Sequence, residues 1–405
     1  MEERAARLVS FLGTGKYEHV THEFDGRRAA TTPYVARALA ELLRPAEVVI
    51  LATAEAEAKH RAALERAFAE GSIAPPSFVR VLAGRDRAEL FELFRILREQ
   101  LRPREGSIVL DITHGFRAQP FFAASVVAFS RAVDPAPAPL RIVYGAFEQK
   151  REDGSAPIWD LSYLADVLDW ASALRLFLRT GRADEAAAAT ESLGRELGKA
   201  WARGGKQGEQ PKIQLLGKAL RRFGADFETL RTGDLLLGRD GKKSSARDLA
   251  EKLRAAEPEV QEHLPPLGEV LNQVQAMVRP LDGAFEDLAC PQGRAAVEAL
   301  AKLYLRLGRY LEAIATVREG LINKRVDARA ARPGAADFDD DERKRAEEEI
   351  RAAPRFKSVA DLRNDLLHAQ YRKRDSARPA DSVIDQVKRA VEEFAAPGSP
   401  PSAGG

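Results

Sequence analysis

The feature that most constrains this fold is a regular alternation of strand-like and helix-like segments over the first 160 residues. Short apolar runs predict strands at residues 6–12, 47–53, 78–82, 107–113 and 140–147. Helical patterns lie between them at residues 33–43, 54–70, 88–101 and 120–132. Because alternating strands and helices favour βαβ units, we expect a Rossmann-like α/β domain with a mostly parallel sheet.

A hairpin is expected to close this domain. Asp153-Gly154 supplies its turn, and residues 157–161 return as an edge strand. From Leu161 onward, apolar residues recur every three or four positions and strand signals are scarce, which predicts an all-α remainder. The helices are expected at residues 161–178, 183–202, 295–307, 310–324, 359–373 and 382–394, with further helices in 213–280.

These patterns divide the chain into consecutive parts. An α/β domain covers 1–160 and the first helices cover 161–204. A helical linker or insertion of unknown role covers 205–290, a second functional helical domain covers 291–396, and a disordered tail covers 397–405.

Composition excludes several classes of site. Lys and Arg number 63 against 61 Asp and Glu, so any nucleic-acid surface is a local patch. The one cysteine, Cys290, permits neither an internal disulfide nor a cysteine zinc site. The histidines form no His-x-x-x-His pair, so no metal is expected. Neither a signal peptide nor a membrane span is predicted, which favours a cytoplasmic protein.

The sharpest local signal is the segment Arg-Asn-Asp-Leu-Leu-His at 363–368. On a helix, Asn364 and His368 lie four residues apart on one face, and Arg363 leans toward that face. We expect the opposite side to be anchored by Leu362, Leu366 and Leu367.

These residue types suit cleavage of an RNA phosphodiester, because the ribose 2′-OH supplies the nucleophile. Histidine as a residue type exchanges protons near neutral pH, and arginine presents a charged fork that matches phosphate oxygens. In the alternative interpretation, Arg363 and Asp365 are surface charges and His368 is a histidine at a helix end. Spacing alone leaves both open.

Two loops follow predicted strands in the α/β domain. Gly13-Thr14-Gly15-Lys16 follows the first strand, and Asp-Ile-Thr-His-Gly-Phe-Arg at 111–117 follows a central one. Ligands of open α/β sheets bind beyond the carboxyl ends of the strands, where free backbone N–H groups attract phosphate. Alternatively, the first loop is only a tight connection, Asp111 caps a turn, and His114 satisfies a backbone carbonyl.

Together these motifs resemble those of a known family. The segment 363–368 resembles the Arg-x-x-x-x-His motif of HEPN ribonucleases, and 111–117 resembles the Asp-x-Thr-His-Gly signature of CRISPR-associated proteins with a CARF sensor domain. Residues 10–39 and 144–161 are similar to the same family. The resemblance covers 1–180 in blocks and returns at 295–373, whereas 205–290 has no match to it.

The resemblance implies a CARF–HEPN endoribonuclease of type III CRISPR antiviral defence. Its activator would be a cyclic oligoadenylate, with cyclic tetra-adenylate favoured, and its substrate would be single-stranded RNA. It further implies a homodimer or higher homo-oligomer in which two protomers complete one nuclease site. Cleavage would need no metal or other cofactor and would leave a 2′,3′-cyclic phosphate.

Residue roles carried over by position follow from the same resemblance. Arg363 and His368 would be catalytic, and Asn364 would support their orientation. Asp111 would organise its loop, since a carboxylate repels phosphate. The expected ligand contacts are Gly13, Thr14, Gly15, Lys16, Thr113, His114, Gly115 and Arg117.

Other functions stay open beside this one. The chain is alternatively a nucleotide-responsive transcription regulator with a helix-turn-helix in 213–280, or a sensor that sequesters or hydrolyses the messenger without cutting RNA. Residues 339–341 are three aspartates. They either begin a helix, where their charge complements the helix dipole, or bind a divalent ion. Two basic stretches either contact RNA phosphates or only face solvent. The first is Arg239, Lys242, Lys243 and Arg247, and the second is Arg372, Lys373 and Arg374, which follow Tyr371.

Overall fold

A computed structural model describes residues 5–102, 106–115, 119–134, 139–203, 206, 210–285, 287–288, 290–329, 340–368 and 378–396. The chain divides into two compact units, Met1–Asp169 and Trp170–Gly405. The division falls inside helix α5 (Ser162–Thr180), so this helix begins in the first unit and ends in the second. The two units are described in turn.

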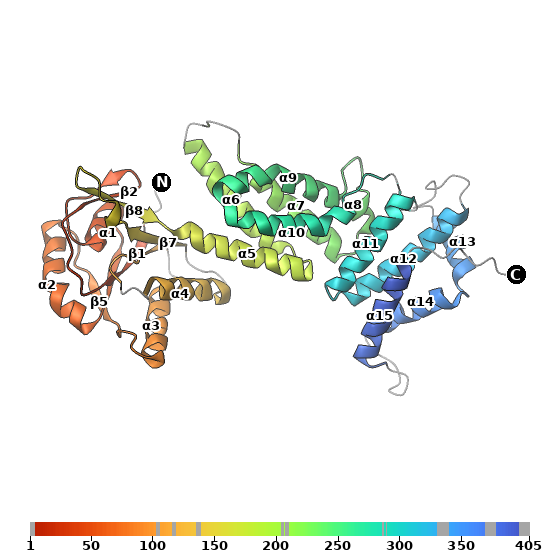
Figure 1. The fold of residues 1–405 in the computed structure, drawn as a ribbon, viewed down its shortest axis with the longest axis horizontal. Coiled ribbons are helices and arrows are strands. Elements are labelled where there is room, and N and C mark those ends of the chain that lie inside the picture. Colours follow the sequence, from red (N-terminus) through yellow and green to blue (C-terminus); the bar gives the residue numbers. More distant parts are fainter. Residues whose placement is uncertain are drawn as a thin grey trace. The chain divides into compact units, whose positions relative to one another are not determined.

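The first unit, coloured red to yellow in Figure 1, is built on one sheet. The sheet has eight strands in the order β3-β2-β8-β7-β6-β1-β4-β5. All its strand pairs are parallel except β2–β3 and β7–β8. The predicted α/β class with a mostly parallel sheet is therefore confirmed. The strands are β1 (Ala5–Leu12), β2 (Thr21–Phe24), β3 (Arg27–Arg28), β4 (Glu47–Ala52), β5 (Ser77–Arg80), β6 (Ser107–Asp111), β7 (Leu140–Gly145) and β8 (Ser155–Asp160).

Helices cover both faces of this sheet, which explains why its central strands are largely apolar. Side chains alternate along β1: Leu8 and Leu12 join the cluster under one pair of helices, and Val9 and Phe11 join the other. The first pair is α1 (Val35–Leu43) and α2 (Ala54–Glu70), and the second is α3 (Arg87–Gln100) and α4 (Gln119–Val133).

The structure corrects one prediction about the sheet. The returning hairpin strand β8 is not at the edge, because β2 pairs with it in parallel, with Thr21 opposite Ser155. No strand was predicted for the stretch that holds β2 and β3, although Asp25-Gly26 forms the turn between them with both residues at positive φ. A short 3₁₀ helix, η1 (Phe147–Gln149), lies between β7 and β8.

In the second unit, the described residues form helices joined by loops and no strand, as predicted for the part after the sheet. Its first group of helices, α6 to α10, follows α5 in the chain, and Trp170 and Phe177 of α5 are buried in the unit. Helices α6 and α7 pack closely because small residues face each other: a Cβ at Gly217 would lie 3.0 Å from the carbonyl oxygen of Ala187. The elements are α6 (Asp184–Arg203), α7 (Ile213–Glu228), α8 (Thr232–Leu236), α9 (Ser245–His263), η2 (Pro265–Leu267), α10 (Gly268–Val278) and η3 (Arg279–Leu281).

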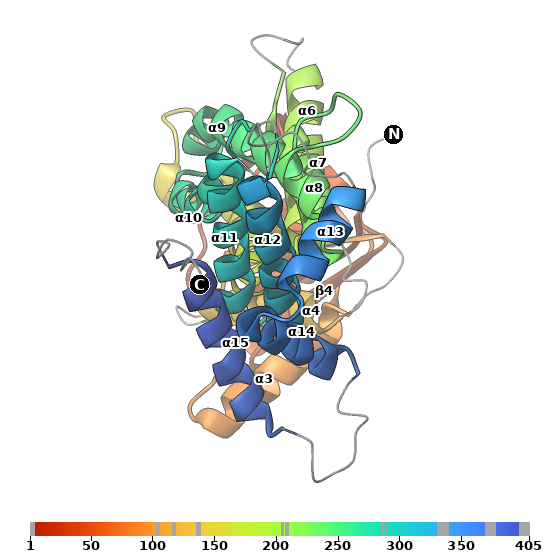
Figure 2. The ribbon, with the colours of Figure 1, turned by 90° about the vertical axis from the view of Figure 1, so that its right-hand side faces the viewer.

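The last five helices of the unit gather around α12 (Tyr310–Arg329), which contacts each of the others (Figure 2). The other four are α11 (Pro291–Arg306), α13 (Asp340–Ile350), α14 (Pro354–Leu367) and α15 (Ala380–Phe394). Phe394 closes on Gly320, where a Cβ would lie 2.3 Å from its ring. Ion pairs such as Arg318–Glu347 and Arg325–Glu349 join α12 to α13.

Several predictions fall beyond the described residues, namely Tyr371, Arg372, Lys373, Arg374, Asp339 and the tail 397–405. Asp340 and Asp341 do begin helix α13, as expected for acids at a helix N-terminus. Within the part of the chain that the structure describes, no helix is long and apolar enough to span a bilayer.

Candidate functional site

Strand pairing brings the two predicted ligand loops together. β1 and β6 are parallel neighbours, with Ser10 opposite Asp111, so the loops that follow them leave the same edge of the sheet. Gly13 marks the point of closest approach, because a Cβ there would lie 2.5 Å from the carbonyl oxygen of His114. The glycine is therefore needed for the two backbones to meet.

Asp111 organises the second loop, in agreement with its expected role. Its side chain is buried, and its two oxygens accept hydrogen bonds from Ser10 Oγ at 2.6 Å and from Thr113 N at 2.9 Å. Thr113 Oγ1 also donates to Asp111, at 2.5 Å, and itself accepts from Gly145 N at 2.8 Å. Burial raises the pKa of the Asp111 carboxyl, against the opposing effect of these hydrogen bonds.

His114 is held as a neutral ring. Burial lowers its pKa to about 3, and the nearby His22 and His60 lower it further. The backbone N–H of Val35 points at His114 Nε2 from 3.5 Å. The neutral ring therefore adds no positive charge to this loop.

Tyr17 holds the first loop in place, although it was not among the predicted site residues. Its ring lies between those of His60 and His114, with centroid distances of 4.7 Å and 4.0 Å. Its hydroxyl accepts from Gly13 N at 3.0 Å and donates to Gly13 O at 2.8 Å. Burial raises the pKa of this phenol to about 12, so it stays protonated.

His60 was also missed, and one sequence signal points to it. It interrupts an apolar stripe on α2 in which Ala56, His60, Leu64 and Phe68 recur every four residues and are all buried. A histidine at such a position needs polar partners inside the fold. Contacts with Gly15 and Tyr34 provide them.

The remaining predicted contacts differ in exposure. Gly15 and Lys16 are exposed, whereas Thr14, Thr113 and Gly115 are half-buried. Lys16 thus stands at the open side of the first loop. Arg117, the second cation expected here, lies outside the described residues.

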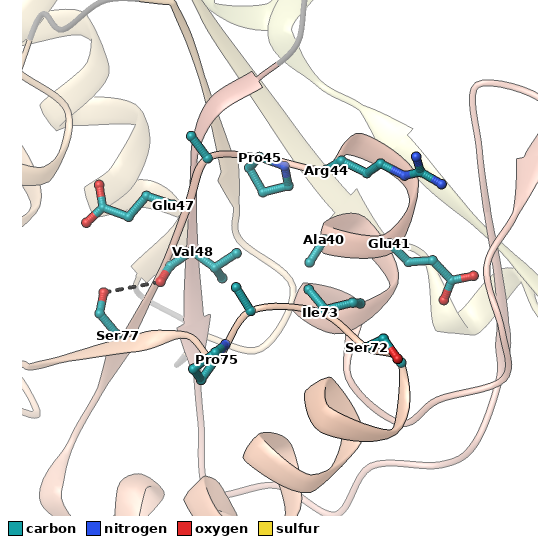
Figure 3. A pocket seen from close by; sticks show the side chains of 13 residues that line it. Ala40, Glu41, Arg44, Pro45, Glu47, Val48, Ser72, Ile73, Pro75 and Ser77 are labelled. Carbon is teal, nitrogen blue, oxygen red and sulfur yellow. Dashed lines mark hydrogen bonds between the residues drawn. The ribbon is translucent and has the colours of Figure 1, made fainter.

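A separate cavity of about 500 Å³ lies at the amino ends of β4 and β5 (Figure 3). Its walls include Arg44 and Pro45, before β4 begins, and Ser72 and Ser77, where Ser77 Oγ donates to Val48 O at 3.2 Å. Because the Gly13 and His114 loops leave the carboxyl ends of the strands, this cavity is not part of their site.

The Arg-Asn-His motif lies at the end of α14 in the second unit. Arg363 and Asn364 are on the helix, and His368 is its C-cap, with its backbone N–H bonded to Asn364 O at 2.9 Å. Arg363 Nη2 donates to Asn364 Oδ1 at 2.7 Å. The His368 side chain is exposed, so the motif faces solvent at the helix end.

The way α14 packs corrects the expected anchoring. Phe356, Val359, Leu362 and Asp365 are buried at every third position, so Asp365 is an inward residue and not a surface charge. Leu362 anchors the helix as predicted, but Leu367 is 52% exposed. The helix also ends at Leu367, before the predicted end at 373.

The basic stretch near α9 is largely neutralised. Arg239 pairs with Asp234 at 3.0 Å, and Lys243 and Arg247 share Glu251 at 2.6 Å and 3.4 Å. This arrangement favours the solvated-loop interpretation over an RNA-binding patch. Among the described residues, no group of three or more His, Cys, Asp or Glu side chains is arranged to hold a metal ion.

Comparisons with known proteins add one likeness. No protein-family model matches the chain, and neither does any curated protein sequence. Among solved structures, Enterococcus italicus Csm6 bound to cyclic hexa-2′-fluoro-hexa-dAMP matches 96% of this chain and 93% of its own, at 10% identity and a TM-score of 0.41. At that TM-score and identity, we draw no conclusion about activity from it.

Proposed function

We propose that the chain is an endoribonuclease that cuts single-stranded RNA, needs no metal, and is switched on by a cyclic oligoadenylate bound to its α/β unit. The observation that carries the proposal is the Arg363–Asn364 hydrogen bond at 2.7 Å beside the exposed His368. This arrangement fixes a guanidinium and leaves an imidazole accessible at one helix end.

These groups match the needs of the reaction. The 2′-OH attacks the adjacent phosphorus, and the 5′-oxygen leaves, which produces a 2′,3′-cyclic phosphate. His368 exchanges the protons, and Arg363 stabilises the phosphorane charge. Asn364 keeps the Arg363 fork in one orientation, as its 2.7 Å hydrogen bond allows.

The sensing half of the proposal rests on the loops at the carboxyl ends of β1 and β6. Gly13 and His114 meet there without room for a side chain, and Lys16 is exposed beside them. A cyclic oligoadenylate carries one negative charge per nucleotide, which suits such an open, cationic loop.

A homodimer is part of the proposal. Helices α4 and α5 expose Phe121, Phe129, Val133, Tyr163, Leu164 and Leu168 in the first unit, each more than two-fifths accessible. Arg131 on α4 pairs with Asp166 and Asp169 on α5, so the two helices are neighbours. Soluble chains rarely leave such surfaces uncovered, and a second protomer would also double the Arg363–His368 set.

The transcription-regulator alternative fits less well. Helix α9 is the longest helix of the 213–280 region, and it carries five acidic residues against three Arg and Lys. DNA phosphates repel such a surface. No observation favours messenger hydrolysis without RNA cleavage over the proposal.

The test is cleavage of a fluorescent single-stranded RNA in EDTA, with and without cyclic tetra-adenylate or cyclic hexa-adenylate. We expect ligand-dependent cutting that EDTA leaves intact and that falls at least 100-fold in Arg363→Ala and His368→Ala. Arg355→Ala, on the same helix with only a 4.0 Å pairing to Glu393, is the matched control and should cut normally. Cutting that persists in both motif variants would refute the proposed nuclease site. RNA that stays intact with both cyclic ligands would refute the proposed activity.

A further inference from the structure

The loop Gly13–Lys16 has three consecutive carbonyl groups engaged by side chains. Gly13 O accepts from the Tyr17 hydroxyl at 2.8 Å. Thr14 O accepts from Lys59 Nζ at 2.5 Å, and Gly15 O accepts from His60 Nε2 at 2.9 Å. Lys59 and His60 are adjacent residues of α2, so that helix fixes two of the three peptide groups.

This arrangement dictates where the amide groups of the loop point. In a trans peptide the N–H lies opposite the C=O of the preceding residue. With their carbonyls held by Tyr17 and α2, the peptides direct the N–H groups of Thr14, Gly15 and Lys16 away from those partners. None of these three N–H groups hydrogen-bonds to any other residue that the structure describes. Consecutive free N–H groups are an anion-binding feature.

The partners of the loop are themselves fixed. To donate to Gly15 O, His60 must carry its proton on Nε2, so Nδ1 accepts from the Tyr34 hydroxyl at 3.3 Å. The buried stripe of α2 holds the His60 backbone in place, and the Tyr17 ring stacks on its imidazole. Burial lowers the pKa of His60, which keeps the ring in this neutral form.

We propose that Tyr17 and His60 are positioning residues that present the N–H groups of Thr14, Gly15 and Lys16 to a phosphodiester anion of the ligand. Lys59, bonded to Thr14 O, adds positive charge at the same loop. This inference rests on the proposed function, because it specifies how the sensing loop recognises its ligand. Neither Tyr17 nor His60 needs to touch the ligand.

The first test measures affinity by calorimetry with the full chain and cyclic tetra-adenylate. Tyr17→Phe keeps the ring and removes the hydroxyl, and His60→Leu removes the donor. Both should raise the ligand Kd at least tenfold while kcat at saturating ligand stays within twofold. His60→Gln restores an N–H donor and should recover most of the affinity. Tyr310→Phe, at a half-buried tyrosine that begins α12 in the second unit, is the control and should bind normally.

The second test separates this inference from the proposed function. In ¹⁵N spectra of the full chain, inorganic triphosphate should shift the amide signals of Gly15 and Lys16, and Tyr17→Phe should abolish the shift. If cyclic oligoadenylates do not bind but triphosphate gives these shifts, the anion loop stands and the proposed function fails. If cyclic tetra-adenylate binds equally to wild type, Tyr17→Phe and His60→Leu, or if neither probe moves those signals, the inference is overturned.

Discussion

A single buried histidine, His22, makes the stability of the first unit depend on pH. His22 is 4% exposed and lies on β2, the strand that completes the sheet beside β8. Burial lowers its pKa from 6.5 to about 4. The folded unit thus keeps the ring neutral at a pH where the unfolded chain protonates it, so acid acts on stability through this residue.

The pH prediction follows with a definite sign. Because the folded pKa of His22 is lower, its contribution to stability is complete above 6.5 and is lost as the pH falls toward about 4. Between pH 7 and pH 5 we expect this residue to lower the free energy of unfolding by about 1–2 kcal/mol. Urea unfolding of wild type and His22→Gln at both pH values measures it, since the variant should lose less stability. Equal losses would contradict the assignment.

At the scale of elements, one ion-pair cluster joins α4, which follows the second predicted ligand loop in sequence, to α5, the helix that leaves the first unit. Helix α4 begins at Gln119, shortly after the Thr113–Gly115 loop. Near its other end, Arg131 Nη1 contacts Asp166 at 2.9 Å and Asp169 at 2.6 Å on α5. The Arg131 side chain is only 18% exposed, so the cluster is partly shielded from solvent.

We predict that Arg131→Met uncouples ligand binding from activation. The methionine keeps an apolar stem on α4 but removes the charge that holds Asp166 and Asp169. The Kd for cyclic tetra-adenylate should stay within threefold, and the stimulation of RNA cleavage should fall at least fivefold, about 1 kcal/mol of coupling. Arg95→Met, which breaks an exposed pair with Glu92 on α3, should leave both values unchanged. Full stimulation in Arg131→Met would rule out this route.

The strands also show which elements can be predicted from the sequence. The segments that became β1, β4, β6 and β7 were predicted because buried parallel strands are continuously apolar. The hairpin of β2 and β3 was missed because its strands are four and two residues long, too short for a pattern. β8 was therefore predicted as an edge strand, because no further strand was available to pair with it.

The candidate site was predictable only where it is local in sequence. Gly13 and His114 were identified from motifs, and the structure brings them together. Lys59 and His60 contact the first loop across 45 residues, which no local pattern reveals. The burial of Asp365 was unforeseen for a related reason: the face of α14 that packs on its neighbours is set by tertiary contacts.

At the scale of the whole molecule, the proposal requires two copies of the chain. The apolar side chains exposed on α4 and α5 are the surface in the described residues that we assign to the second copy. Leu164 and Leu168 are 51% and 55% exposed and lie four residues apart on one face of α5. A nuclease site completed by two protomers makes activity depend on this surface.

We therefore expect Leu164→Glu with Leu168→Glu to shift the chain to a monomer in light scattering after size exclusion. Charges on a buried apolar interface are strongly unfavourable, so RNA cleavage should fall at least tenfold at micromolar protein. Leu215→Glu, at a leucine 45% exposed on α7, should remain a dimer with full activity. A dimeric double variant would exclude this surface as the interface.

The pairing of β2 with β8 has a consequence for synthesis. The sheet is complete once Asp160 has left the ribosome, because β8 is its last strand in the chain. Arg363 follows the end of the first unit at Asp169 by 194 residues (363 − 169). At ribosomal speeds of about 5–20 residues per second, this interval lasts about 10–40 s, and domains fold as units from the N-terminus. The unit that we propose to bind the activator can thus fold before the ribosome has made the residues that we propose to cut RNA.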